Sequence, residues 1–169
     1  MKKNLVLLGM MAVGKTTLGK IVAKDQQLEF IDTDEIIEKK NSMTINEIFE
    51  KKGEIFFREE EKKVILKCLK KNNCVIALGG GAFINKTIRE NVLKRTISIW
   101  LDIDIKTLSK RSKWSQRRPL LKKEDNREKI YKLYSERKNI YKLANHKIEC
   151  STLSKENIAK KIIELYEKY

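Results

Sequence analysis

Residues Gly9–Thr16 read Gly-Met-Met-Ala-Val-Gly-Lys-Thr, which fits the pattern G-x-x-x-x-G-K-[ST] of a phosphate-binding loop. The apolar run Leu5–Leu8 before the loop predicts a buried strand, and the segment after it predicts a helix. A loop at this junction directs backbone N–H groups and the helix dipole at phosphate oxygens. We therefore expect Lys15 to reach the β- and γ-phosphates of a nucleotide and the Thr16 hydroxyl to ligate Mg²⁺. The alternative is a chance match in a lysine-rich chain.

The composition of the 169-residue chain limits the classes of protein to which it can belong. The length suits a single domain, residues 1–169, and a chain that is 41% hydrophobic and 36% charged is typical of a soluble globular protein. No apolar run approaches the roughly 20 residues that span a bilayer, and the run near the N-terminus is too short for a secretory signal. We therefore expect a cytoplasmic protein without a membrane partner. We also expect a monomer, although the sequence has no pattern that decides the oligomeric state.

The cysteines and the histidine suggest no metal centre. Cys68, Cys74 and Cys150 are odd in number and lie in apolar stretches, which favours buried thiols over disulfides or metal ligands. His146 is the only histidine, so a histidine-rich metal site and a histidine-based triad are both excluded. We interpret His146 as a residue at a strand edge with no special role.

The net charge of +15, from 38 basic and 23 acidic residues, is compatible with a nucleic-acid partner. The lysines are scattered along the chain, however, and neither an arginine-rich tail nor a basic patch interleaved with aromatic residues occurs. We favour solvated lysine faces that also steer an anionic small molecule toward the protein, and we expect no nucleic-acid partner.

Apolar runs of strand length alternate with longer segments of helical periodicity. The predicted strands are 4–8, 29–31, 74–78, 97–101 and 147–149, and the predicted helices are 15–24, 33–40, 45–51, 54–71, 86–94, 105–111, 127–143 and 155–167. Thr44 with Glu47, Asn85 and Ser154 are the expected helix caps. The alternation predicts an α/β fold with a parallel sheet covered by helices on both faces. Ligands of such folds bind beyond the carboxyl ends of the strands.

Acidic residues follow two of the predicted strands. Asp32 and Asp34 come after the second strand, and two carboxylates at i and i+2 on a strand end point toward the same crevice. One could lie near Mg²⁺ and the other could face a second substrate, although Asp32 could also simply cap the next helix. Asp102 ends the fourth strand and competes with Asp32 for the metal, and Asp104 is a nearby helix cap.

Gly79, Gly80 and Gly81 follow the third strand. Three consecutive glycines are costly in chain entropy, and a turn requires only one of them. The triplet therefore indicates backbone that approaches a ligand closely or exposes N–H donors, with a plain glycine-rich turn as the alternative.

The predicted helix 54–71 places charged residues where its apolar stripe should continue. The stripe runs through Phe57, Val64, Ile65, Cys68 and Leu69, and at helical spacing it continues through Glu61, Arg58 and Glu54. Either this end is exposed and Glu54 pairs with Arg58, or it faces a polar cleft in which Arg58 binds an anion and Glu61 holds the guanidinium group. We favour the cleft.

Residues 111–125 lose the apolar periodicity and contain Pro119, the only proline. A basic, irregular segment of this length predicts an active-site lid, with a disordered surface loop as the alternative. An arginine on such a lid could close onto a transferring phosphoryl group and exclude water.

Together these motifs resemble shikimate kinases, of the nucleoside-monophosphate-kinase-like branch of P-loop proteins. The resemblance spans about residues 4–163. Its motifs are G-x-x-x-x-G-K-T at Gly9–Thr16, Asp32-Thr33-Asp34, Ile48-Phe49-x-x-x-Gly53-Glu54-x-x-Phe57-Arg58-x-x-Glu61, Gly79-Gly80-Gly81, Arg118-Pro119-Leu120-Leu121 and Arg137-x-x-x-Tyr141. The set at these spacings is far more specific than the phosphate-binding loop alone.

The resemblance implies a three-layer P-loop kinase fold with a five-stranded sheet, and transfer of the γ-phosphoryl group of ATP to the 3-hydroxyl of shikimate in aromatic amino-acid biosynthesis. It implies a substrate-binding helical region at about 33–61 and a lid at about 111–125. The implied ATP-binding residues are Gly9, Ala12, Val13, Gly14, Lys15, Thr16, Thr17, Arg111 and Arg118. The implied Mg²⁺ residues are Thr16 and Asp32, and the implied catalytic residues are Asp34, Lys15 and Arg118. The implied shikimate-binding residues are Asp34, Phe49, Phe57, Arg58, Gly79, Gly80, Gly81 and Arg137.

The sequence departs from the family pattern in the phosphate-binding loop, where Ala12 replaces the usual glycine and its Cβ could restrict the loop. The adjacent Arg117 and Arg118 leave the register of the lid arginine open by one residue, and we take Arg118 because it precedes proline. The alternative enzyme is another small-molecule kinase of the same branch, such as a gluconate kinase. A nucleic-acid-binding ATPase is an alternative of a different class.

Overall fold

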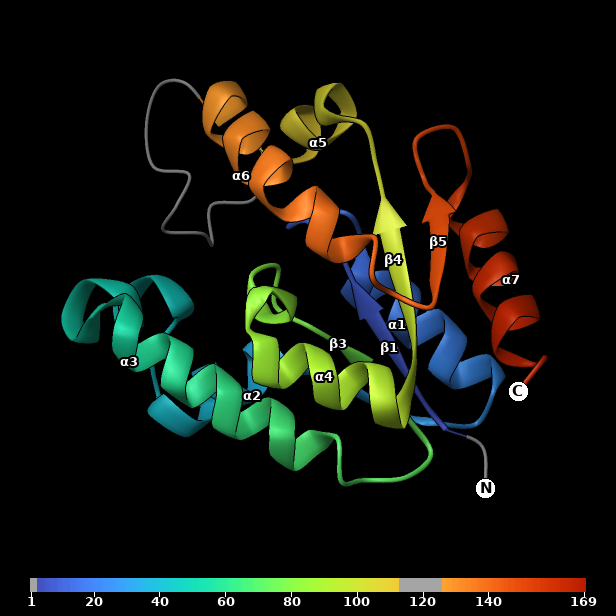
Figure 1. Cartoon of the computed structure of the whole chain (residues 1–169), viewed down its shortest axis with the longest axis horizontal. Helices are drawn as coiled ribbons and strands as arrows, with labels where there is room; N and C mark the ends of the chain where they lie inside the picture. The colour runs from blue at the N-terminus through green and yellow to red at the C-terminus, as the bar shows by residue number, and fades with distance from the viewer. Residues whose placement is uncertain (1–2, 113–125) are drawn as a thin grey trace.

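The computed structural model describes the backbone of residues 3–112 and 126–169 and the side chains of residues 3–110 and 128–169 (Figure 1). The elements follow one another as β1 (Asn4–Leu8), α1 (Lys15–Asp25), β2 (Glu29–Asp32), α2 (Thr33–Asn41), α3 (Ile45–Cys68), β3 (Cys74–Ala77), the 3₁₀ turn η1 (Ala82–Ile84), α4 (Lys86–Arg95), β4 (Thr96–Asp102), α5 (Ile105–Ser112), α6 (Asn126–Tyr141), β5 (His146–Glu149) and α7 (Lys155–Tyr166). Strands and helices thus alternate as predicted.

The five strands form one parallel sheet in the order β2-β3-β1-β4-β5. The central strand β1 pairs on both sides, so that Leu7 lies opposite Ala77 of β3 and Ile99 of β4. All residues of β1, β3 and β4 are buried, because helices cover both faces of the sheet. This arrangement confirms the predicted α/β fold.

The helices form the two outer layers. Helices α1 and α7 pack against each other on one face, while α4 and the C-terminal part of α3 lie over the other (Figure 1). Helix α2 packs against α3, and α5 packs against α6. Within the described ranges, no helix combines the length and the apolar character needed to cross a membrane.

The strand order brings the chemically important segments to one edge of the sheet. The phosphate-binding loop follows β1, Asp32 ends β2, the glycine triplet follows β3 and Asp102 ends β4. Because all five strands run in the same direction, these segments meet at the carboxyl edge, where ligands of open α/β sheets bind.

The predicted helix caps are confirmed. Thr44 forms a reciprocal capping box with Glu47 at the start of α3. The side chain of Asn85 accepts a hydrogen bond from the Ile88 N–H, 3.2 Å away, and Ser154 caps α7 in the same way. These side chains satisfy backbone donors that the first turn of a helix leaves without an intrahelical partner.

Two helix predictions between 45 and 71 need correction. The expected helices 45–51 and 54–71 form the single element α3, which is kinked at Gly53 with φ 83° and ψ 168°. The element ends at Cys68, three residues earlier than expected. Gly53 bends the helix because a glycine adopts positive φ without a steric clash of Cβ.

The three cysteines are free and buried, as predicted. Within the described part of the chain, no cluster of three or more His, Cys, Asp or Glu residues could hold a metal ion. His146 begins β5, and its Nε2 lies 3.0 Å from the hydroxyl group of Tyr169. The histidine therefore links the outer strand of the sheet to the last residue of the sequence.

Candidate active site

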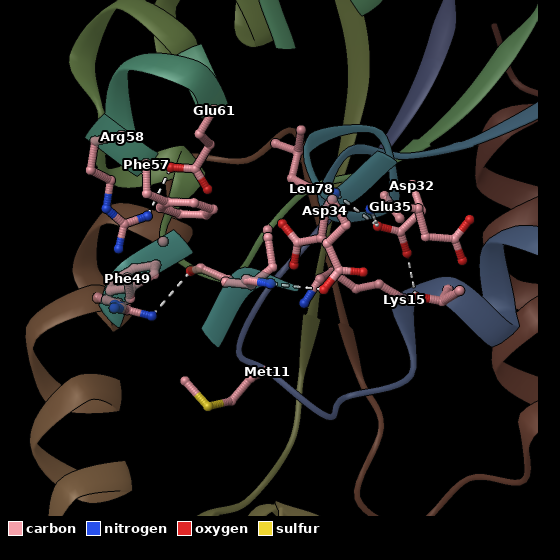
Figure 2. Close-up of a pocket in the computed structure, with 18 residues that line it drawn as sticks. Met11, Lys15, Asp32, Asp34, Glu35, Phe49, Phe57, Arg58, Glu61 and Leu78 are labelled. Atoms are coloured by element: carbon pink, nitrogen blue, oxygen red, sulfur yellow. Dashed lines mark hydrogen bonds and ion pairs between the residues drawn. The ribbon is translucent and has the colours of Figure 1, made fainter. Parts of the chain in front are cut away.

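A cavity of about 220 Å³ opens at the carboxyl edge of the sheet (Figure 2). Its lining contains Met11, Lys15, Thr16, Asp32, Asp34, Glu35, Glu38, Ile45, Phe49, Phe57, Arg58, Glu61, Ala77, Leu78, Gly79, Gly80, Gly81 and Arg137. In the view of Figure 2, Arg58 and Glu61 lie on one side, Asp32 and Lys15 lie on the other, and Asp34 lies between them. The cavity thus has one side that carries the Arg58–Glu61 ion pair and another next to the phosphate-binding loop.

The phosphate-binding loop has the backbone geometry of an anion site. Gly9 and Gly14 adopt φ values of 137° and 103°, and a Cβ on Gly9 would lie 2.5 Å from the Leu101 carbonyl oxygen. Helix α1 begins at Lys15 and has no side-chain cap at Gly14, so the start of the helix faces the loop directly, as in helix N-termini that bind anions. The Lys15 ammonium group folds over the loop and donates to the carbonyl oxygens of Gly9 and Met10, at 2.9 and 2.8 Å.

Ala12 occupies the left-handed region of backbone space, with φ 60°. A residue with a Cβ is strained there by roughly 1–2 kcal/mol, whereas glycine is not. The departure of Ala12 from the family pattern therefore has a structural consequence: the loop adopts its turn in spite of the Cβ.

Asp32 combines the two roles that the sequence left open. Its Oδ2 accepts a hydrogen bond of 2.6 Å from the Thr16 hydroxyl, and its Oδ1 accepts from the N–H groups of Asp34 and Glu35 at the start of α2. The side chain is therefore both a helix cap and the partner of the residue expected to ligate Mg²⁺.

Asp102, the competing acid, is engaged elsewhere. The Tyr134 hydroxyl donates to Asp102 Oδ1 at 3.0 Å, and the Lys147 ammonium lies 2.7 Å from Oδ2. Burial raises the pKa of Tyr134, and the bond to the Asp102 carboxylate raises it further. This arrangement leaves Asp32, rather than Asp102, as the acid that contacts the phosphate-binding loop through Thr16. Asp104 caps α5 through the Thr107 N–H, as expected.

Contrary to the prediction from its spacing to Asp32, Asp34 does not lie on the end of a strand. Strand β2 ends at Asp32 and α2 begins at Thr33, so Asp34 lies in the first turn of a helix rather than on a strand. Both carboxylates nevertheless line the cavity, because the chain enters α2 directly at the sheet edge.

Thr33, between the two acids, is a site residue that the sequence reasoning missed. Its buried hydroxyl donates to the Ala77 carbonyl oxygen and accepts from the Gly79 N–H, both at 3.2 Å. This hydroxyl ties the start of α2 to the start of the glycine triplet. Its place between the two acids of the Asp-Thr-Asp motif was the available signal.

The glycine triplet makes room for charged side chains. A Cβ on Gly79 would lie 2.6 Å from Asp34 Oδ1 and 2.8 Å from Glu61 Oε1, and a Cβ on Gly81 would lie 2.7 Å from Arg58 Nη1. A side chain at Gly79 or Gly81 would therefore displace these charged groups from their present positions, because the backbone runs directly beneath them. A plain glycine-rich turn would not need this space.

Arg58 forms both of the ion pairs that the sequence offered as alternatives. Its Nη1 lies 2.8 Å from Glu61 Oε2, and its Nη2 lies 3.2 Å from Glu54 Oε1. Glu61 is only 2% exposed, and burial raises the pKa of its carboxyl group, although the Arg58 guanidinium opposes this effect. Burial would lower the pKa of Arg58, but Glu61 and Glu54 outweigh it and raise that pKa. Glu61 thus holds Arg58 at the cavity wall.

Helix α6 supplies the second arginine of the cavity. Arg137 is buried, and its Nη1 donates to the Gly80 carbonyl oxygen at 3.3 Å. The Tyr141 hydroxyl, one turn later, donates to the same carbonyl oxygen. An apolar wall completes this side, because the rings of Phe49 and Phe57 pack with their centroids 4.7 Å apart.

The predicted residues that meet at the cavity are Lys15, Thr16, Asp32, Asp34, Phe49, Phe57, Arg58, Gly79, Gly80, Gly81 and Arg137. Gly9, Ala12, Val13, Gly14 and Thr17 belong to the adjacent loop and the first turn of α1. Glu35 and Glu38 were not predicted, although Glu38 lies four residues after Asp34 on α2 and so shares its face. The side chain of Arg111, both candidate lid arginines Arg117 and Arg118, and lid residues 113–125 lie outside the described residues.

A five-stranded parallel sheet, helices on both faces and a phosphate-binding loop after the central strand define a P-loop kinase of the nucleoside-monophosphate-kinase-like type. Within this class, the chain belongs to the shikimate kinase family, because the family model "Shikimate kinase" matches residues 11–167.

Individual relatives of the chain are also shikimate kinases. The shikimate kinase of Bartonella henselae is 42% identical over 167 residues, covering 99% of this chain and 80% of the relative. The shikimate kinase of Bacillus subtilis is 41% identical over 170 residues, covering 96% of this chain and 88% of the relative.

Solved structures separate this family from the alternative kinase. The Acinetobacter baumannii shikimate kinase in complex with shikimate matches with a TM-score of 0.95 and 34% identity, covering 99% of this chain and 94% of that one. A gluconokinase from Sinorhizobium meliloti matches with a TM-score of 0.62 and 11% identity, covering 98% of this chain and 92% of that one. The second likeness shows the fold alone.

Proposed function

We propose that the protein transfers the γ-phosphoryl group of ATP to the 3-hydroxyl group of shikimate, as a step of aromatic amino-acid biosynthesis. The observation that supports this function most directly is the convergence of Arg58, Arg137 and Asp34 on one cavity beside the phosphate-binding loop. A small carboxylate-bearing alcohol needs cationic donors at one end and a proton acceptor at the other. The cavity offers both.

The guanidinium groups of Arg58 and Arg137 would bind the substrate carboxylate. Both side chains are held before a ligand arrives, Arg58 by Glu61 and Arg137 by the Gly80 carbonyl oxygen. This arrangement lowers the cost of ordering the site on binding. The rings of Phe49 and Phe57 would pack against the carbon ring of the substrate.

Asp34 would orient the reacting hydroxyl group and accept its proton. Its place in the first turn of α2 is fixed, since its own N–H is bound by Asp32, 3.0 Å away. Phosphoryl transfer depends on positioning and charge stabilisation more than on covalent chemistry. Lys15 would leave the loop carbonyl oxygens and bind the phosphates, and Arg118 would contact the same phosphates.

The residues present fit a magnesium ion. The Thr16 hydroxyl and the Asp32 carboxylate lie 2.6 Å apart, and Mg²⁺ prefers oxygen ligands and retains several of its waters. Thr16 would ligate the ion and Asp32 would hold it through water. The ion would neutralise charge on the nucleotide phosphates.

We further propose that the protein works as a cytoplasmic monomer, without a nucleic-acid or membrane partner. The scattered lysines support the absence of a nucleic-acid partner. Nucleic acid that stimulated ATP hydrolysis, with a steep loss of the effect in salt, would contradict it.

A coupled assay of ADP release tests the proposed function. The purified protein is offered ATP, Mg²⁺ and, in separate reactions, shikimate, gluconate or a nucleoside monophosphate. We expect ADP release with shikimate as the second substrate, and none above background with gluconate or a nucleoside monophosphate. The assignment would be overturned if shikimate did not raise ADP release above the rate measured with ATP and Mg²⁺ alone.

A further inference from the structure

The backbone of Gly80 and Gly81 is held by α6 through a single carbonyl group. The Tyr141 hydroxyl and Arg137 Nη1 both donate to the Gly80 oxygen. Tyr141 is fully buried, with its ring 5.9 Å from that of Trp100 and its hydroxyl 3.8 Å from Met10 Sδ. The tyrosine therefore has a fixed position from which its hydroxyl reaches the glycine triplet.

The position of this carbonyl group determines the direction of the next N–H group. The peptide between Gly80 and Gly81 is trans and planar, so its C=O and N–H bonds point in opposite directions. Because α6 binds the carbonyl oxygen, the Gly81 N–H points away from α6. Among residues 3–110 and 128–169, whose side chains are described, no acceptor binds this N–H, and Gly81 lines the cavity.

Gly81 lies at the cationic end of the cavity. A Cβ at this residue would meet Arg58 Nη1 and Nη2 at 2.7 and 2.8 Å, so the backbone runs directly against the guanidinium group. An N–H donor at this place would join the two arginines around a substrate carboxylate. Glycine peptides are conformationally free, so they need an external contact to hold one orientation.

We propose that Tyr141 is a positioning residue for substrate binding: its hydroxyl fixes the Gly80–Gly81 peptide so that the Gly81 N–H faces the carboxylate group of the substrate. The inference rests on the proposed function, because it assumes a carboxylate between Arg58 and Arg137. It adds a residue that touches neither substrate nor nucleotide and that acts through one peptide plane.

The variant Tyr141→Phe removes the hydroxyl and keeps the ring. We expect its KM for shikimate to rise about ten-fold, since a hydrogen bond to a charged group is weakened, while kcat and the KM for ATP change less than about three-fold. Tyr134→Phe is the matched control on α6, because its hydroxyl binds Asp102 instead of the glycine triplet. Tyr166→Phe is a second control, a buried tyrosine on α7. Both controls should keep the wild-type KM for shikimate.

Two kinetic outcomes would overturn the proposal. One is a Tyr141→Phe variant with the wild-type KM for shikimate. The other is an equal rise in Tyr134→Phe, which would assign the effect to the docking of α6. Failure of the wild-type protein to phosphorylate shikimate is a separate outcome, because it would refute the proposed function of the protein rather than the role of Tyr141.

A spectroscopic test on the wild type does not depend on the folding of any variant. The seven glycines include only two Gly–Gly peptide bonds, 79–80 and 80–81. Protein labelled with [1-¹³C, ¹⁵N]glycine should therefore give two signals in a carbonyl-to-amide correlation spectrum. We expect shikimate to shift the amide proton of Gly81, and Tyr141→Phe to shift the Gly80 carbonyl carbon without ligand. A Gly81 amide that shikimate leaves unmoved would refute the inference.

Discussion

The hydroxyl group of Thr16 in α1 donates a hydrogen bond of 2.6 Å to the carboxylate of Asp32 at the end of β2. The other oxygen of the same carboxylate accepts from two N–H groups of α2. One side chain therefore joins the phosphate-binding loop to the helix that carries Asp34. Its charge and its capping function can be separated by mutation, because asparagine is as good a helix cap as aspartate.

Asp32→Asn should weaken magnesium binding and leave the fold intact. We expect the Mg²⁺ concentration for half-maximal activity to rise at least about ten-fold, as for residues that hold metal ligands. The free energy of unfolding should stay within about 0.5 kcal/mol of the wild type, whereas Asp32→Ala should lose about 1 kcal/mol because the cap is removed. Magnesium titrations and urea unfolding measure the two effects. Asp104→Asn, at the cap of α5, is the control, and an unchanged magnesium requirement in Asp32→Asn would refute the role.

Asp34→Asn should nearly abolish turnover while ATP still binds. The amide cannot accept the proton of the substrate hydroxyl, and loss of general-base catalysis costs roughly 10²–10⁴-fold in kcat. Calorimetry of nucleotide binding to the same variant supplies the control. A comparable loss of ATP affinity would show that Asp34 serves the nucleotide rather than the second substrate.

The sequence predicted the fold well because the three central strands β1, β3 and β4 are largely apolar and buried, and each begins and ends close to the predicted bounds. The predicted strand 4–8 and the caps Asn85 and Ser154 depend on local signals, namely hydrophobic periodicity and side chains that accept backbone N–H groups. The kink at Gly53 was harder to predict, because glycine both ends helices and bends them. The sequence around Gly53 fits both outcomes, and in the structure α3 packs against both α2 and α4.

The candidate site was predicted mostly through its motifs, and the reasons for several residues became visible only in three dimensions. Arg58 and Glu61 could be paired from helical spacing alone. The contact of Thr33 with Gly79 joins residues 46 positions apart, and that of Tyr141 with Gly80 joins residues 61 apart. No local pattern encodes such distances, so the tertiary structure was needed to find them.

Glu60 and Glu61 are adjacent on α3, and their pKa values shift in opposite directions. Burial raises the pKa of Glu61, whereas the hydrogen bond from Lys40, 2.5 Å away, lowers the pKa of Glu60. A raised carboxyl pKa means that the folded state binds the proton more tightly, so this stabilisation is lost as the pH rises above about 4.3, the usual glutamate pKa. A lowered pKa stabilises the folded state above that pH, and the contribution is lost as the pH falls.

The two variants Glu61→Gln and Glu60→Gln should therefore differ in their pH dependence. Relative to the wild type, Glu61→Gln should become more stable as the pH rises from about 4.3 toward 7, because the buried charge is removed. Glu60→Gln should become less stable over the same range. Urea unfolding at several pH values measures both trends, and parallel trends in the two variants would contradict the assigned directions.

Ala12 tests how the backbone of the phosphate-binding loop governs nucleotide affinity. At φ 60° a β-branched residue is a genuine outlier, so Ala12→Val should lose about 1 kcal/mol or more of stability and raise the KM for ATP several-fold. Ala12→Gly removes the strain but gains entropy in the unfolded state. Its free energy of unfolding should therefore stay within about 0.5 kcal/mol of the wild type, and its KM for ATP should not rise.

Asn73→Val is the matched control, because Asn73 has φ 57° in the exposed turn before β3. It should lose similar stability and keep the wild-type KM for ATP. If Ala12→Val also keeps that KM, the loop tolerates the distortion and its conformation does not limit nucleotide binding.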